Sequence, residues 1–371
     1  MVGGAALVGA TPGSAQDAHY WTLQYGPRSS LLGGAVIGSV DDVSATFYNP
    51  GAVSLASDLA FAVSTDVFEY SVVSLEDGGG NGVDLGTAKT GLRPSFVAGT
   101  ITRSLFGGEG ILAYSALTRS RGTQDLAGAV FLTADEIPPE AGLDDAVGSV
   151  DFTGRFNDFW GGLSYSHGLG EHFGLGVTWY GAVRSQNRQQ QSIAQFVDTD
   201  GSGRTEIDNA SGKYTDFRTL FKFGASFRAG SITGGATLTT PSIHISGNGE
   251  LGVNQSAIGA DTTALLAGIQ TDLPAEYRSP LSIGGGLAWR VGPARVHGSV
   301  EWFDKVDRYV VIQGDSLYAQ EPEGEGFVLD AVHEQTAVTN WGVGLEYAIS
   351  KAFTGYLSYF TDNSTLDEDL E

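Results

Sequence analysis

The sequence has no cysteine and a single methionine in 371 residues. The lack of cysteine excludes disulfide bonds, thiolate catalysis and cysteine-ligated metals, but it does not identify a cellular compartment. Positive charge is also scarce, because 20 Lys and Arg stand against 43 Asp and Glu, which gives a formal net charge of −23. This charge argues against nonspecific binding to nucleic acid or anionic lipid, although an acidic cytosolic or halophilic protein would share it.

Long hydrophobic runs are missing as well. No window approaches about 18 consecutive apolar residues, so the sequence predicts no membrane-spanning helix. A membrane location would therefore require a closed β-barrel, because only that strand architecture satisfies the backbone polar groups in lipid. Residues 1–16 contain a short apolar stretch followed by small residues, without a preceding Lys or Arg. We expect an exported protein in which residues 1–16 are the remnant of a signal peptide.

What the sequence does contain is two-residue alternation. In residues 172–184, one parity carries Phe173, Leu175, Val177 and Trp179, and the other carries small, polar or charged residues. The pattern recurs in residues 217–228, 281–291, 295–302 and 340–349. A soluble β-sandwich also alternates, but here the apolar face is bulky and aromatic, and the runs exceed the usual strand length of about 5–6 residues. These features favour strands that cross a bilayer, which takes about 9–11 residues with the apolar face outward.

We therefore expect an all-β fold, a transmembrane antiparallel β-barrel of about 12 strands. The barrel would occupy residues 59–371, and residues 17–58 would form an N-terminal hatch, or plug, inside its lumen. Long acidic stretches predict extracellular loops, and short turns that contain glycine predict periplasmic ones. The long stretches are 76–91, 122–150, 188–213 and 313–336, and the short turns are 229–231 and 291–293.

The hatch is indicated by residues 29–57, SSLLGGAVIGSVDDVSATFYNPGAVSLAS. Small residues allow close backbone packing, and the Asn-Pro step favours a turn, so the stretch predicts a compact plug. It resembles the N-terminal hatch of the FadL-type outer-membrane transporters, which are channels for long-chain fatty acids and hydrocarbons. That family carries a similar glycine-rich run with acidic residues and an F-Y-N-P-A-type motif just before its barrel. The corresponding hatch and gating candidates here are Asp41, Asp42, Phe47, Asn49, Pro50 and Gly51, the last in place of the family's alanine.

The resemblance implies a passive outer-membrane channel that admits hydrophobic or amphipathic small molecules, such as long-chain fatty acids or hydrocarbons. It implies a movable hatch that Asp41 and Asp42 hold against the wall, and the alternative is a static segment whose aspartates only cap turns. A barrel of that family has about fourteen strands. We therefore expect about two C-terminal strands to be missing after the acidic end of the chain, with a natural twelve-stranded barrel as the alternative. A non-transporting barrel that serves as a scaffold or shuttle in protein secretion, and a soluble acidic β-protein, are the alternatives in function.

Several cations fall on the polar parity of the expected strands and would face the lumen. There a guanidinium or ammonium group could bind the carboxylate head of an amphipathic ligand. The same cations could instead pair with Glu301, Glu346 and the hatch aspartates in structural networks. The candidates for ligand contact are Arg184, Arg218, Lys222, Arg228, Arg290 and Arg295.

One acidic stretch resembles part of a calcium-binding loop, with oxygens at positions 1, 3, 5 and 9 and glycine at position 6. The candidate ligands are Asp198, Asp200, Ser202 and Glu206, but Asn209 stands where the bidentate glutamate belongs, so a plain turn is the alternative. The histidines show no metal-binding spacing, and Ser166 and His167 alternate to opposite faces of a strand.

We therefore expect no enzyme activity, no cofactor and no nucleic-acid partner. The expected partners are a hydrophobic or amphipathic small molecule and the lipid or lipopolysaccharide of an outer membrane. We expect the protein to be a monomer in the outer membrane of a Gram-negative-type bacterium.

Overall fold

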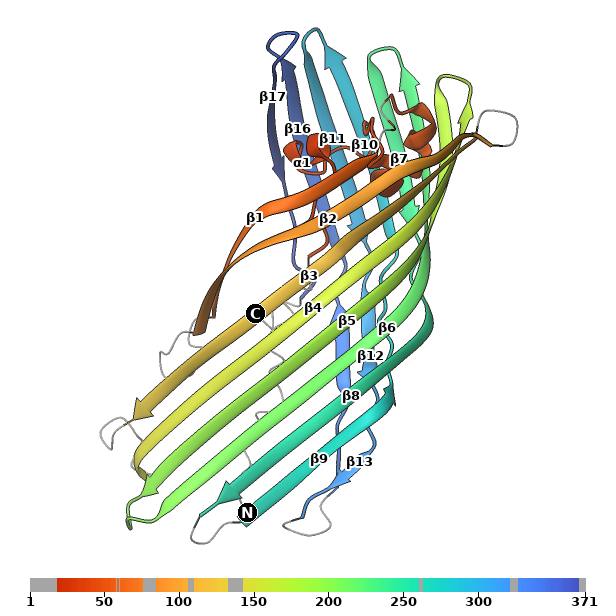
Figure 1. Cartoon of the computed structure of the whole chain (residues 1–371). Helices are drawn as coiled ribbons and strands as arrows, with labels where there is room; N and C mark the ends of the chain where they lie inside the picture. The colour runs from red at the N-terminus through yellow and green to blue at the C-terminus, as the bar shows by residue number, and fades with distance from the viewer. Residues whose placement is uncertain are drawn as a thin grey trace.

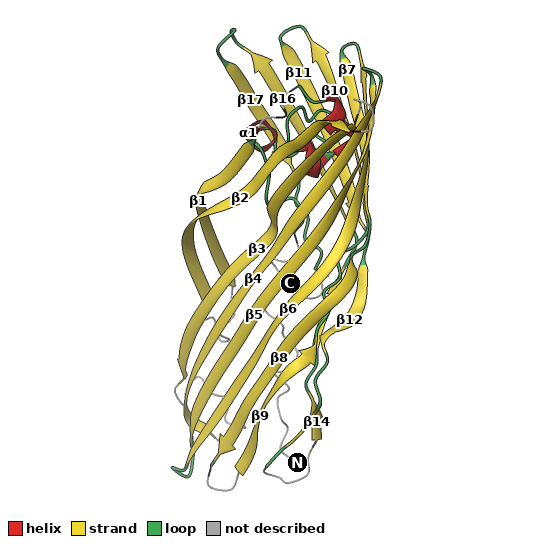
Figure 2. Cartoon of the chain, turned by 45° about the vertical axis from the view of Figure 1, so that its right-hand side comes forward, coloured by secondary structure: helices red, strands yellow, loops and turns green. Residues whose placement is uncertain are grey.

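The computed structural model describes residues 19–57, 59, 61–75, 85–105, 110–132, 143–259, 263–320 and 326–366. In these residues, 13 strands form one antiparallel sheet that curls into a barrel, with short helices inside one end of it (Figures 1 and 2). The helical elements are α1 (Pro27–Leu31), α2 (Ala45–Tyr48) and the 3-10 helix η2 (Pro50–Leu55). The strands of the sheet are β1 (Ala62–Leu75), β2 (Leu85–Leu105), β3 (Gly110–Leu132), β4 (Leu143–Leu169), β5 (Phe173–Asp198), β6 (Gly203–Ala229), β7 (Ile232–Thr239), β8 (Ile243–Ile258), β9 (Thr263–Pro274), β10 (Ser282–Val291), β11 (Ala294–Phe303), β16 (Val338–Ala348) and β17 (Thr354–Phe360). Four short strands form two further ribbons, β12 (Val306–Ile312) with β15 (Ala331–Gln335) and β13 (Ser316–Tyr318) with β14 (Gly326–Val328).

The apolar parity of the strands faces outward, as the sequence predicts. Trp179, Phe223, Trp289 and Trp341 are 50%, 46%, 57% and 43% exposed, although each is a large apolar side chain. A soluble sandwich would bury these side chains against a second sheet. The transmembrane barrel is therefore confirmed, because a face that carries so many exposed large apolar side chains requires a lipid environment. The described residues contain no helix that is both long and apolar enough to cross a membrane.

The apolar belt on the outer face has a sharp edge. On β5, the outward residues are apolar or glycine from Phe173 to Val183, and then the next four outward residues, from Ser185 to Gln191, are polar. Asn157 on β4 and Thr215 on β6 are the register partners of Ser185, and each marks the same change on its own strand. The belt on β5 spans about 11 residues, which matches the length of a tilted bilayer crossing.

The wall is continuous on one side of the barrel and interrupted on the other. Strands β3 to β6 run for 23, 27, 26 and 27 residues without a break. Strands β7, β10, β11 and β16 have only 8, 10, 10 and 11 residues. Their ends lie in one row, because Thr239, Ser282, Phe303 and Val338 are successive register partners. Beyond that row, β6 pairs with β8 instead of β7, after a bend that contains Pro241.

Two details differ from the sequence-based expectations. The sequence predicts about twelve strands, whereas 13 strands form the sheet in the described residues. The strand that was not predicted is β9, whose apolar residues do not alternate cleanly. The expected long loop at 188–213 is instead the far half of β5 and β6, which meet in a tight turn at 199–202. The expected loop at 122–150 likewise contains the end of β3 and the start of β4. Residues 1–16, the expected signal-peptide remnant, lie outside the described residues.

Strands β1 and β17 are the two ends of the hydrogen-bonded sheet, and no described residue of one pairs with the other. The N-terminal segment lies between them (Figure 1). The backbone N–H of Gly26 donates to Ser64 Oγ of β1 at 3.1 Å, and Gly33 lies against the ring of Phe360 of β17. The hatch thus contacts both end strands of the barrel wall.

Candidate functional site

Residues 19–57 fill the lumen at the end of the barrel where the strand turns are short (Figure 2). Tyr25, Leu32, Val36 and Tyr48 are buried there and belong to one apolar core together with wall residues of β2 to β6, including Trp160. The hydroxyl of Tyr48 donates to Gln24 Oε1 at 2.8 Å and accepts from the Tyr25 N–H at 2.9 Å. Burial raises the pKa of Tyr48 well above its ordinary value, so the phenol stays neutral.

Glycines on the inner face of the wall let the hatch backbone approach closely. A Cβ atom on Gly224 would lie 2.3 Å from Asn49 Oδ1, and one on Gly176 would lie 2.3 Å from the Pro50 carbonyl oxygen. A Cβ on Gly174 would lie 2.2 Å from the Gly51 carbonyl oxygen. These distances are too short for any side chain, so the small residues on the polar parity form the surface on which the hatch rests.

Asn49 joins the hatch to the wall and has no exposed surface. Its Nδ2 donates to the Ile37 carbonyl and to the Ala225 carbonyl of β6, both at 3.0 Å. Its Oδ1 accepts the Gly51 N–H at 3.0 Å and so caps the start of η2, where Pro50 occupies the first position. The Asn-Pro-Gly motif is therefore a helix start whose capping side chain also binds the barrel.

The two aspartates of the hatch make different contacts. Asp41 Oδ1 accepts from the Ser57 N–H at 2.9 Å and lies 3.4 Å from Arg228 Nη2 of β6. Asp42 Oδ1 accepts from the Ser44 N–H at 2.8 Å and from the Ser44 hydroxyl, which is a local turn contact. Asp41 thus has the wall contact that the resemblance implies for both, while Asp42 caps a turn.

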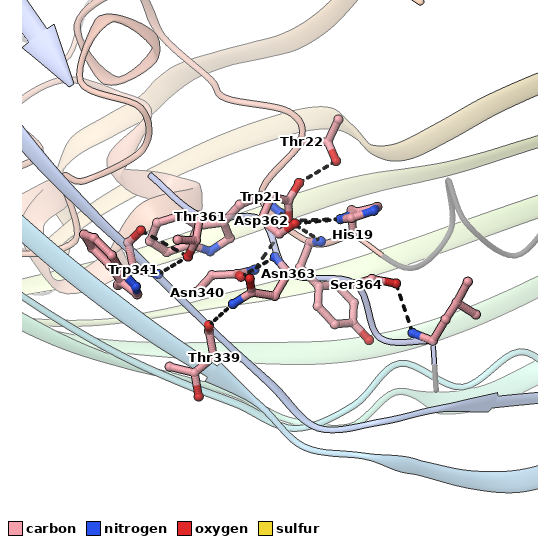
Figure 3. Close-up of polar contacts among 12 residues, drawn as sticks. His19, Trp21, Thr22, Thr339, Asn340, Trp341, Thr361, Asp362, Asn363 and Ser364 are labelled. Atoms are coloured by element: carbon pink, nitrogen blue, oxygen red, sulfur yellow. Dashed lines mark hydrogen bonds and ion pairs between the residues drawn. The ribbon is translucent and has the colours of Figure 1, made fainter. Parts of the chain in front are cut away.

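Asp362, two residues after the end of β17, holds the segment that enters the hatch (Figure 3). Its Oδ1 accepts the N–H groups of Tyr20 at 3.1 Å and Trp21 at 2.8 Å, and its Oδ2 accepts the Thr22 hydroxyl at 2.8 Å. The Trp21 indole N–H also donates to Glu301 Oε2 of β11 at 3.0 Å. The carboxylate fixes the backbone of this segment, and the segment forms one side of a cavity.

That cavity lies between the hatch and the wall and encloses about 900 Å³ of space, part of it open to solvent. Hatch residues line one side, and residues of β3, β4, β6, β10 and β11 line the other. Tyr277, Ser279 and Pro280 also line it, and they come from the segment between β9 and β10 where the wall is interrupted. Its aromatic residues include Tyr20, Trp21, Phe47, Trp160, Tyr277 and Phe303.

Lys222 is the one sequence-predicted cation among the residues that line this cavity. Its Nζ lies 4.7 Å from the ring centre of Phe47 and 4.0 Å from Glu301 Oε1. The same carboxylate accepts from the Ser282 hydroxyl at 2.9 Å. Phe47 packs edge-on against Tyr25, with ring centres 4.7 Å apart. A hatch aromatic and a wall cation thus meet at the surface of the cavity.

Arg119 also lines the cavity, and the sequence did not single it out. It stands at a bulge in β3, where Thr118 pairs with Phe159 and Ser120 pairs with Asp158. Its guanidinium lies 5.7 to 5.8 Å from the ring centres of Tyr20, Phe47 and Trp160, and Nη1 donates to the Tyr20 carbonyl. Among the described residues, no carboxylate pairs with it. A bulge changes the parity, so alternation could not reveal this residue.

The other predicted cations serve the wall or the hatch. Arg218 is buried, pairs with Asp158 and Asp216, and lies over Tyr277. Arg184 is also buried and donates to the Tyr214 hydroxyl. Of the rest, Arg228 contacts Asp41 and the Leu55 carbonyl, Arg295 donates to Thr233, and Arg290 is exposed.

The predicted calcium ligands lie in and beside the tight turn between β5 and β6, with Asp198 at the end of β5 and Glu206 within β6. Ser202 donates its N–H to Asp200 at 2.8 Å and its hydroxyl to Asp198 at 3.1 Å, while Glu206 pairs with Arg204 at 3.3 Å. Within the described part of the chain, no group of three or more His, Asp or Glu side chains is placed to hold a metal ion. The contacts are those of a hydrogen-bonded turn.

These features define a transmembrane β-barrel with a lumenal plug and an aromatic cavity beside the plug. No protein-family model and no curated protein matches the sequence. Solved structures do match, at 12–15% identity over most of the chain. A TodX deltaS2S3 mutant monoaromatic hydrocarbon channel matches with a TM-score of 0.64 at 14% identity, over 94% of this chain and 85% of that one.

Two further matches agree with it. The toluene transporter TodX of Pseudomonas putida matches with a TM-score of 0.61 at 15% identity, over 91% of this chain and 83% of that one. The toluene transporter TbuX of Ralstonia pickettii matches with a TM-score of 0.57 at 12% identity, over 91% of this chain and 86% of that one. The chain therefore has the fold of the FadL-type hydrocarbon transporters, which the hatch motif predicts.

Proposed function

We propose that the protein is a passive channel that admits hydrophobic or amphipathic small molecules through an outer membrane. The observation that carries this proposal is the aromatic cavity between the hatch and the wall. Solved structures of the same fold are described as monoaromatic hydrocarbon channels and toluene transporters, which supports it. Transfer of apolar surface from water, at about 25 cal/mol per Å², would draw the ligand into the cavity.

The charges in the cavity favour a ligand that carries a carboxylate. Asp158 is paired with Arg218, and Glu301 lies beside Lys222, so these two acids are compensated. Arg119 adds a cation that no described carboxylate neutralises. An aromatic or aliphatic acid could place its apolar part among Phe47 and its neighbours and its carboxylate between Arg119 and Lys222. Long-chain fatty acids belong to this class of ligand.

Uptake of toluene and benzoate into proteoliposomes would test the proposal, because the two ligands differ mainly in the carboxylate. Hydrogen bonds to a charged group contribute about 1.5–3 kcal/mol, so Lys222→Met should lower benzoate uptake about tenfold or more and leave toluene uptake nearly unchanged. Arg119→Gln should act in the same direction. Lys305→Met, at an exposed lysine that pairs with Asp307 outside the cavity, is the matched control.

Equal losses for toluene and benzoate would contradict the carboxylate site but not the channel. No uptake of either ligand by the unmodified protein would contradict the channel itself. The secretion scaffold is not proposed further, because the solved structures that match the fold are described as hydrocarbon channels and toluene transporters.

A further inference from the structure

A groove crosses the outer face of the continuous wall just beyond the apolar belt. It has a volume of about 890 Å³, part of it open to solvent, and runs across β3, β4, β5, β6 and β8. Its floor is the backbone of one row of inward-facing residues, among them Phe156, Gln186 and Tyr214, which are successive register partners. Its two walls are the outward side chains of the rows on either side of that floor.

The two walls carry hydrogen-bonding groups and cations. Asn157, Ser185, Thr215 and Asn248 line the wall nearer the belt, and Thr123, Arg155, Asn187, Lys213 and Glu250 line the farther wall. Each set is one register row, so the groove follows the edge of the belt around the barrel. Amides, hydroxyls and cations in a row are the groups that bind a phosphorylated sugar.

Arg155 is the most informative residue in the groove. Its side chain is exposed, its register partners are Thr123 and Asn187, and it forms no ion pair among the described residues. Lys213 pairs with Glu250 at 2.8 Å but stays 58% exposed, so part of its ammonium group is free to donate. An uncompensated arginine on the outer face is notable in a chain with a net charge of −23, because most of its surface would repel anions.

The belt supplies the other half of a lipid site. Phe159, Val183 and Phe217 form the next outward row toward the membrane centre, and they are register partners of one another. Phe159 and Phe217 are 43% and 46% exposed. A lipid whose acyl chains lie along this row would have its head group at the level of the groove. The groove also lies at the end of the belt that is remote from the hatch and the short turns.

We propose that this groove binds the phosphorylated sugar head group of a glycolipid in the outer leaflet, with lipid A as the chemical type. The proposal rests on the outer-membrane location given above, but not on transport. Arg155 would bind a phosphate through its guanidinium fork, and the Asn and Ser side chains would bind sugar hydroxyls. A glycerophospholipid has no sugar to fill the amide-lined wall, so it should bind more weakly.

Native mass spectrometry of the full chain in non-ionic detergent, titrated with lipid A, tests this site. A cation near a membrane surface contributes about 1 kcal/mol, so Arg155→Gln and Lys213→Gln should each weaken lipid A binding about fivefold. Arg204→Gln removes the same charge from β6 far from the belt and should leave binding within about twofold. A double variant that combines Arg155→Gln with Lys213→Gln should bind lipid A weakly. The unmodified protein should bind lipid A without phosphates about as weakly as that.

The proposal is overturned if Arg155→Gln and Arg204→Gln bind lipid A equally well. It is also overturned if phosphatidylglycerol binds as tightly as lipid A and loses the same factor in Arg155→Gln, because the groove would then select charge alone. Toluene uptake by Arg155→Gln separates this proposal from transport. Unchanged uptake with weakened lipid binding supports the lipid site, and absent uptake with intact lipid A binding contradicts only the channel.

Discussion

The continuous and the interrupted side of the barrel differ in the contacts that they make with the hatch and the cavity. On the continuous side, β5 and β6 are paired residue by residue from Phe173 to Val197, and their glycines receive the Asn-Pro-Gly motif. On the interrupted side, β10 and β11 stop at one row, and the segment between β9 and β10 inserts Tyr277 into the lumen. The glycines of the first side receive the Asn-Pro-Gly motif, and the second side adds Tyr277, from outside the ladder, to a cavity that residues of β3, β4 and β6 also line.

The difference follows from hydrogen bonding in the wall. A sheet in lipid must pair every backbone group, so an interruption is tolerated where the freed backbone is buried in protein or lines a cavity. The breaks on the interrupted side lie in the row of Thr239 and Ser282, at the ends of the short strands. Beyond that row, the segment that follows β9 meets β12 through the bridge of Ala275 with Ile312 and the bond from the Glu276 N–H to the Val311 carbonyl, and not through a continuous ladder of described residues. Chain freed from the ladder can enter the lumen.

The largest expected effect comes from a side chain on the hatch-bearing surface. Gly224→Val should displace the hatch, because its Cβ would lie 2.3 Å from Asn49 Oδ1 and 2.8 Å from the Gly51 nitrogen. Overpacking of this kind costs about 1–3 kcal/mol or more. Limited proteolysis should cleave residues 19–57 much faster, and urea titration in detergent should show a lower free energy of unfolding.

Gly181→Val is the matched control on the neighbouring strand, since nothing lies within 4 Å of its added Cβ. It should leave both measurements unchanged or improve stability, because valine suits an outward strand position. If the two variants behave alike, the hatch does not depend on the glycine surface, and the functional contrast between the two sides fails.

The second expected effect concerns backbone dynamics. Amide hydrogen exchange should be on the order of a hundredfold faster in β12 and β15 than in the central part of β5. The ribbon of β12 and β15 has few register partners, whereas β5 has a full ladder on both sides. Mass spectrometry of exchanged peptides in detergent would measure this. Equal protection of β12 and β5 would mean that the interrupted side is closed by contacts as strong as a ladder.

The sequence predicts the continuous side better than the interrupted one, for a physical reason. Alternation within the belt is local, so the outward parity of Phe173 and Trp179 and the glycine surface can be read directly. Beyond the belt both faces of a strand meet water, and residues such as Gln189 and Gln190 give no alternation, so long strands are mistaken for loops. The direction of the Arg119 side chain depends on a bulge in β3, and local alternation does not encode a bulge.

The site residues also differ in how far the sequence predicts them, because some depend on neighbours in sequence and others on distant strands. Asn49 and Pro50 were predicted from a motif whose geometry is set by neighbours in sequence, and they lie at the start of η2. Their role in gating stays a prediction. Arg218 was predicted to contact ligand on parity alone, but its ion pairs with Asp158 and Asp216 depend on strands distant in sequence. Parity indicates which face a cation occupies, and only the register indicates which acid it meets.

The smallest expected effect tests whether the interrupted segment is held by charge. Glu276 and Arg278 form a pair at 2.7 Å on the surface of this segment, and the hydrogen bond from Arg278 lowers the pKa of Glu276 below its ordinary value. A carboxyl whose pKa is lower in the folded state stabilises the fold above its unfolded pKa, and it loses that contribution as the pH falls through the folded pKa. Glu276→Gln should therefore lower the free energy of unfolding by less than about 0.5 kcal/mol at neutral pH, as expected for an exposed pair, and by nothing at low pH.

Glu334→Gln, at an exposed carboxylate on β15 without an ion pair among the described residues, controls for the loss of charge. Urea titrations of both variants between neutral and acidic pH would compare them. A difference for Glu276→Gln that persists at low pH would show that packing, not charge, holds the segment. The Tyr277 ring centre lies 4.0 Å from the Arg184 guanidinium and 4.9 Å from that of Arg218. Because the surface pair of Glu276 and Arg278 is weak, these two ring contacts should hold Tyr277 in place more than the pair does.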